Sequence, residues 1–91
     1  MKSNVHVLIS GRVQGVWFRT STKQKAEQLG LAGWVKNTSD GSVEAIFEGD
    51  EKGIKDMLEW CHRGPPLAKV SNVEVKNQES TNGFDGFSIK Y

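Results

Sequence analysis

A change of hydrophobic period across a short glycine-punctuated segment is the strongest constraint on the fold of this 91-residue chain. Residues 5–10 form a β-rich run in which apolar side chains recur at every second position and Leu8 adds one on the other face, so the run could be a central strand buried on both faces. From Phe18 the spacing becomes helical, and Gly30 supplies a stop for that helix. The helical stripe comprises Phe18, Thr22, Ala26 and Leu29. Residues 11–17 therefore have to carry the chain directly from a strand into an amphipathic helix.

The remaining elements follow from the same patterns. Further strands are expected near residues 33–38, 42–48, 70–76 and 87–91, with a polar loop over residues 77–85. A second helix is expected with Asp50 as its N-cap, and Gly64, Pro65 and Pro66 end it. This order predicts an α+β fold, the ferredoxin-like split βαβ sandwich (βαββαβ plus a short C-terminal strand). Two helices should cover one face of a mostly antiparallel sheet.

Composition narrows the class of protein. The length predicts a single domain over residues 1–91, and no apolar run approaches membrane-spanning length. The first residues are too few and too polar to begin a secretory signal, and the lone Cys61 fits a reducing compartment as a buried small residue. We therefore expect a cytoplasmic protein, a monomer without membrane partners. The net charge of +1 is far from the basic excess of a nucleic-acid binder.

The segment between the first strand and the first helix has the build of an anion cradle. Gly11 and Gly15 allow successive backbone N–H groups to point into one concavity, and the helix start adds unpaired N–H groups. Arg19 offers a planar fork that matches two phosphate oxygens. The segment lacks the Lys-Ser or Lys-Thr of a Walker loop and the third glycine of the dinucleotide fingerprint. On these residues alone, a tight strand-to-helix turn with a surface arginine remains an equal alternative.

Asn37 is the second candidate for chemistry. It shares a strand face with Val35 and lies just before the turn that contains Asp40 and Gly41. An asparagine in this place often bonds its own backbone, and Asp40 and Gly41 are typical turn residues. Alternatively, a neutral amide that both donates and accepts can hold a water molecule for attack on an anion in the cradle.

Together the two segments resemble the acylphosphatase family. Members carry G-x-V-Q-G-V-x-F-R, matched by residues 11–19. They also carry G-W-V-K-N followed by three residues, a glycine, one residue and a valine, matched by residues 33–43. The resemblance implies hydrolysis of small acyl phosphates to a carboxylate and inorganic phosphate, with neither metal nor cofactor. It also implies that Asn37 orients the attacking water and that Arg19 binds the phosphoryl group. The resemblance further implies that backbone amides of the loop bind the phosphoryl group together with Arg19. These amides belong to Gln14, Gly15, Val16, Trp17 and Phe18.

Other polar residues have weaker claims. Thr38 and Ser39 could hydrogen-bond Asn37 or a loop carbonyl, and His6 could approach the site if its strand face allowed it. His62 and Cys61 are helix neighbours that point apart, which argues against a metal pair. With no general base in either motif, the substrate's own phosphate oxygen is the expected proton acceptor.

The aromatic residues of the two motifs are interpreted as structural residues rather than as substrate contacts. Trp17 and Trp34 are more often core or cradle-wall residues than substrate contacts.

Two rival functions share the predicted fold. The first is a module that holds carbamoyl phosphate or a similar anion for a larger enzyme without hydrolysing it. The second is an RNA-binding domain. Glu44 and Glu48 on the third strand argue against it, because their carboxylates would repel phosphates. The expected partners are thus an acyl phosphate and inorganic phosphate, and no nucleic acid.

Overall fold

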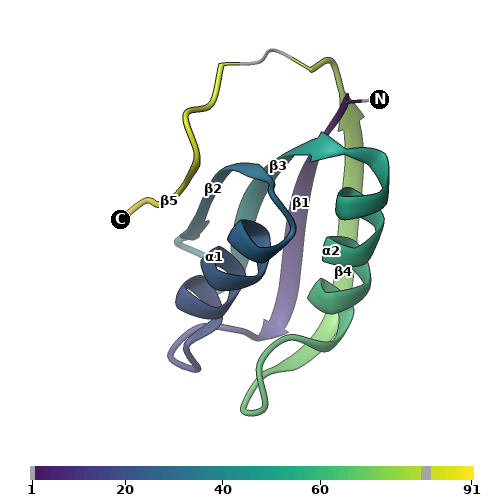
Figure 1. The fold of residues 1–91 in the computed structure, drawn as a ribbon. Coiled ribbons are helices and arrows are strands. Elements are labelled where there is room, and N and C mark those ends of the chain that lie inside the picture. The colour runs from purple at the N-terminus through teal and green to yellow at the C-terminus, as the bar shows by residue number, and fades with distance from the viewer. Residues whose placement is uncertain (1, 81–82) are drawn as a thin grey trace.

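The computed structural model describes residues 2–80 and 83–91, so residues 81–82 of the expected polar loop lie outside the described residues. The chain forms five strands and two helices in the predicted order (Figure 1). Their bounds are β1 Lys2–Arg12, α1 Phe18–Gln28, β2 Ala32–Asn37, β3 Val43–Asp50, α2 Glu51–Arg63, β4 Lys69–Gln78 and β5 Phe87–Ile89.

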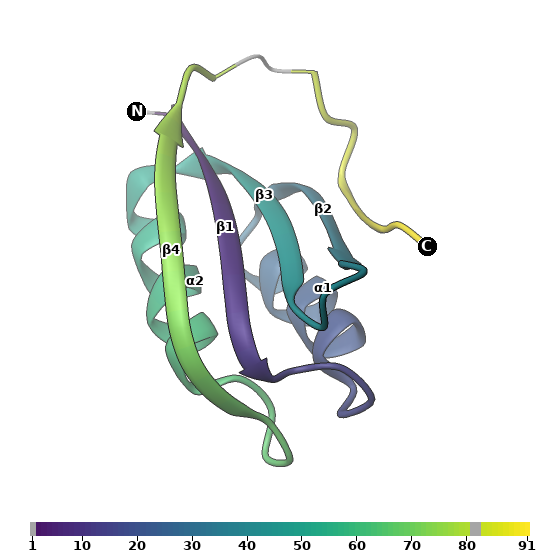
Figure 2. The same cartoon turned by 180° about the vertical axis from the view of Figure 1, so that it is seen from behind.

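The strands make one sheet in the order β4-β1-β3-β2-β5. Figure 2 shows both helices on the same face, behind β4, β1, β3 and β2. All neighbours are antiparallel except β2 and β5, which run parallel. This confirms the ferredoxin-like α+β class, because strands β1 and β3 are central and each helix connects two strands across the sheet. The strand β1 lies between β3 and β4, so the segment that follows it starts from the middle of the sheet.

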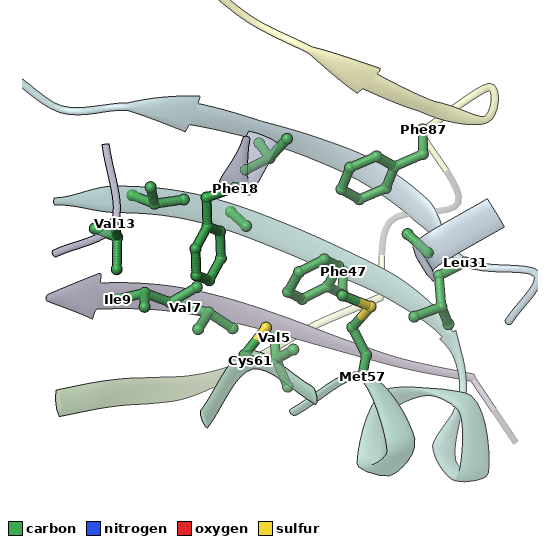
Figure 3. Close-up of a cluster of buried hydrophobic side chains, with 14 of the residues drawn as sticks. Val5, Val7, Ile9, Val13, Phe18, Leu31, Phe47, Met57, Cys61 and Phe87 are labelled. Atoms are coloured by element: carbon green, nitrogen blue, oxygen red, sulfur yellow. The ribbon is translucent and has the colours of Figure 1, made fainter. Parts of the chain in front are cut away.

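The hydrophobic core lies between the helices and the sheet (Figure 3). Apolar side chains of β1 alternate into it as predicted, and Phe18 of α1 meets them there beside Phe47 of β3. Cys61 is fully buried on α2, and burial raises the pKa of its thiol to about 12. The cysteine therefore behaves as a small apolar core residue. Neither helix of the described residues combines the length and the apolarity that crossing a membrane takes.

Two details differ from the sequence prediction. Asp50 is the N-cap of α2 by position, but its side chain makes no capping hydrogen bond. The helix start instead has Glu51 in its first turn, where a negative charge interacts favourably with the helix dipole. At the other end of the chain, β5 stops at Ile89, so Tyr91 does not continue the strand. Tyr91 is 99% exposed, which a third inward-facing strand residue would not be.

The strands β1 and β4 are longer than their apolar runs because pairing continues beyond the core. Their ladder shifts register between Ser10 and Gly11, just before the loop. Gly11 has φ +122°, and a Cβ there would lie 2.3 Å from the carbonyl oxygen of Lys69. A glycine is therefore required where β1 leaves the sheet.

The sheet face opposite the helices carries a small polar cluster. His6 Nε2 lies 2.6 Å from Glu44 Oε2, and Lys36 Nζ lies 3.6 Å from Glu44 Oε1. Trp34, half-buried on this face, has Lys90 Nζ at 4.6 Å from its ring centroid. The hydrogen bond with His6 lowers the pKa of Glu44 below its usual value of 4.5, and Lys36 adds to the effect.

This cluster predicts a pH-dependent part of the stability. Because the pKa of Glu44 is lower in the folded than in the unfolded protein, its contribution is complete above pH 4.5 and is lost as the pH falls through the folded pKa. Glu44→Gln should lower the free energy of unfolding by about 0.5–1 kcal/mol at neutral pH and by less in acid. Urea unfolding of both proteins between about pH 7 and pH 3 measures the difference. Glu59→Gln, an exposed position on α2, is the control; a Glu44 effect that stays constant across this range would contradict the prediction.

Candidate active site

Buried side chains fix the backbone of the segment between β1 and α1. Val13, Val16 and Phe18 are each at most 5% exposed and pack into the core. Between them, Gly15 and Trp17 take left-handed backbone conformations with φ of 73° and 65°. The buried side chains alternate along the loop with the two left-handed residues, so the backbone of the loop is held in one defined conformation. Gly15 has open space around it, and its backbone angle rather than crowding favours glycine there.

The N-terminus of α1 places the positive end of the helix dipole next to the loop. The backbone N–H of Ser21 makes the first helical hydrogen bond, 3.0 Å from the carbonyl oxygen of Trp17. The N–H groups of Phe18, Arg19 and Thr20 therefore precede the helical ladder and have no acceptor within it. No acidic residue lies in the first turn, so no carboxylate of that turn offsets the helix dipole. Such an end binds anions.

Arg19 and Asn37 line one cavity of about 320 Å³ between the loop and the end of β2. The remaining lining residues are Val13, Gly15, Trp17, Phe18, Thr20 and Tyr91. Arg19 is half-buried, and its guanidinium carbon lies 4.9 Å from the centroid of the Tyr91 ring. The two residues predicted to carry the chemistry thus come from separate segments and meet at one place.

The amide of Asn37 has an unused acceptor. Its Oδ1 atom is buried and receives no hydrogen bond from the described residues. The neighbouring turn is closed by other groups: Thr38 N–H donates to the Ser42 carbonyl at 2.9 Å, and Ser42 N–H donates to Thr38 Oγ1 at 3.0 Å. Since an unpaired buried acceptor costs about 1–3 kcal/mol, a turn-capping role does not explain Asn37.

Gln14 links the loop to the hairpin that carries Asn37. Its Nε2 donates to the carbonyl oxygens of Thr38 and Ser42, each at 2.8 Å. The sequence interpretation used only the backbone amide of Gln14 and missed this side chain. A polar side chain next to the buried Val13 was the one available signal, and it does not identify the hydrogen-bond partner. The link fixes the distance between the cradle and the end of β2.

Thr38 and Ser39 do not contact Asn37 through hydrogen bonds among the described residues. The Thr38 hydroxyl instead bonds the Asp40 carboxylate, which lowers the pKa of Asp40, and Ser39 is exposed. Thr38 therefore shapes the turn after Asn37.

Several other candidates lie elsewhere. His6 is on the open face of the sheet, bonded to Glu44, and His62 is exposed on α2 with Nδ1 at 2.8 Å from the Leu58 carbonyl oxygen. Trp34 is also on the open face, whereas Trp17 borders the cavity. A larger cavity of about 580 Å³ lies between the helices near Gly64 and holds neither Arg19 nor Asn37. Within residues 2–80 and 83–91, no three His, Cys, Asp or Glu side chains gather as metal ligands would.

The fold and this loop define a ferredoxin-like protein in which the loop after the first strand leads to a helix N-terminus that carries Arg19. Comparison with known proteins narrows the class. The sequence model of the acylphosphatase family matches residues 5–89. Two curated relatives named acylphosphatase come from Rubrobacter xylanophilus, 50% identical over 94% of this chain and 78% of the relative, and Pelotomaculum thermopropionicum, 47% identical over 99% and 98%.

A solved structure agrees with these relatives. The crystal structure of the acylphosphatase from Bacillus subtilis superposes with a TM-score of 0.94 at 40% identity, over the full length of both chains. The chain belongs to the acylphosphatase family, and the resemblance in its two motifs is confirmed. It is accordingly an enzyme that hydrolyses acyl phosphates.

Proposed function

We propose that the chain hydrolyses small acyl phosphates without a metal ion, using Arg19 and the loop amides to hold the phosphoryl group and Asn37 to orient water. The observation that carries this proposal is the buried, unpartnered Oδ1 of Asn37 in the cavity that Arg19 also lines. A water molecule that donates to this oxygen is held beside a bound phosphoryl group. The amides of Gln14, Gly15, Val16, Trp17 and Phe18 belong to the phosphate-binding loop.

The proposed chemistry needs positioning and charge stabilisation more than a protein nucleophile. The water oxygen forms a bond to phosphorus while the bond from phosphorus to the acyl oxygen breaks, and a carboxylate leaves. Charge builds on the phosphoryl oxygens, where Arg19 and the helix N–H groups donate. Preorganised donors of this kind typically contribute about 10²–10³-fold each.

The attacking water's proton goes to the substrate. Among the residues that the structure describes, neither His6 nor His62 lines the cavity, and no Asp or Glu does. A phosphoryl oxygen of the substrate is the acceptor within reach, so the products are a carboxylate and dihydrogen phosphate. Charge and atoms balance without a protein base.

Metal independence gives a direct prediction. Chelators should leave turnover unchanged, whereas phosphate and sulfate should inhibit competitively, raising KM without changing kcat, because they occupy the same cradle. Steady-state rates with an aromatic acyl phosphate, with and without EDTA, test this. Loss of activity to EDTA with recovery on added zinc or magnesium would contradict it. Binding of phosphate without any turnover would favour a module that only holds the anion.

A further inference from the structure

Trp17 occupies a position that the packing of the fold does not explain. Of the described residues it is the one non-glycine with positive φ, at 65°, and it is 74% exposed. A bulky residue is disfavoured in this conformation, and an exposed indole gains little from burial. Backbone outliers of this kind concentrate at ligand sites.

The cavity that holds Arg19 and Asn37 is bordered by two exposed aromatic side chains. Trp17 and Tyr91 both line it, and Tyr91 is 99% exposed. The cavity therefore combines the donors of the loop with aromatic surface. An acyl group is joined to phosphorus through one oxygen, so it extends from the cradle within a few bond lengths of those donors.

We infer that Trp17, together with Tyr91, recognises the acyl group and favours flat, apolar acyl groups over small ones. This inference rests on the proposed function, because it assumes that the phosphoryl group sits at Arg19. Aromatic faces attract other rings by offset stacking and by burial of apolar area. An acetyl group offers neither to any comparable extent. The substrate class favoured by this chain is therefore the aromatic acyl phosphates.

The kinetic test compares benzoyl phosphate with acetyl phosphate. Trp17→Asn removes the ring, and asparagine tolerates the left-handed backbone that the loop needs. We expect kcat/KM for benzoyl phosphate to fall about three- to tenfold relative to that for acetyl phosphate, as loss of one aromatic contact implies. The loss should appear in KM rather than kcat, since the ring binds the ground and transition states alike. Tyr91→Ala should act in the same direction.

Matched variants separate recognition from structure. Trp17→Phe should retain most of the preference, and Trp34→Ala, which removes the same residue type on the opposite face of the sheet, should not change it. The inhibition constant of inorganic phosphate should stay within twofold in Trp17→Asn. Equal losses for both substrates, or no loss for either, would overturn the inference while leaving the hydrolase intact. Failure of the wild-type chain to hydrolyse either substrate would overturn the proposed function, and the inference with it.

Discussion

Replacing Arg19 by alanine is expected to abolish measurable hydrolysis while the fold survives. The guanidinium lines the cavity beside the N-terminal amides of α1, and among the described residues that line the cavity Arg19 is the one arginine. An arginine that stabilises a transferring phosphoryl group contributes about 10³–10⁵-fold in comparable enzymes. Half-buried on a helix, Arg19 can be replaced by alanine, a strong helix former, without leaving a hole in the core. Circular dichroism and urea unfolding verify that the variant is folded.

Two further variants show whether the geometry or the charge matters. Arg19→Lys should recover little activity, because a point charge cannot reproduce the paired hydrogen bonds of a planar guanidinium. Arg12→Ala, an exposed position at the end of β1 that does not line the cavity, removes a nearby positive charge and should change turnover only slightly. Half the wild-type kcat in Arg19→Ala at saturating substrate would show that the role assigned to Arg19 is wrong.

The order of elements was predictable because each has a local signature in the sequence. Alternation at β1 and helical spacing from Phe18 follow directly from which faces are buried. The C-terminal end of α1 also has a local signal. Gly30 follows the helix with φ 70°, a left-handed conformation that few residues other than glycine adopt. These features depend on neighbours in the chain, which a sequence shows.

Contacts between distant segments were not predictable in the same way. The hydrogen bonds from Gln14 to the hairpin span 24 and 28 residues, and the approach of Tyr91 to Arg19 depends on how β5 pairs with β2. The left-handed backbone of Trp17 has no local signal either, since tryptophan is a poor choice for that conformation. The family resemblance implied Arg19 and Asn37 as a pair. The residues that position and surround this pair could be identified only from the fold.

Asn37→Ala is expected to lower kcat by about two to three orders of magnitude, by analogy with deleting one preorganised hydrogen-bonding group. The affinity for inorganic phosphate should barely change, because Arg19 and the loop amides hold the anion. The substitution removes a buried acceptor that no described residue satisfies, so stability should not fall by more than about 1 kcal/mol. The effect therefore belongs to the chemical step, whereas an Arg19 effect extends to binding.

In Asn37→Ala, single-turnover kinetics measure the rate of the chemical step, and calorimetric titration measures the affinity for inorganic phosphate. Asn72→Ala, which removes the same side chain from an exposed position on β4, controls for a general effect of losing an amide. Equal losses in phosphate affinity and rate would show that Asn37 shapes the cradle rather than the water position. Normal turnover would return Asn37 to a structural role, although Thr38 and Ser42 already close the turn beside it. A slow chemical step with unchanged phosphate binding is the result that the buried Oδ1 predicts.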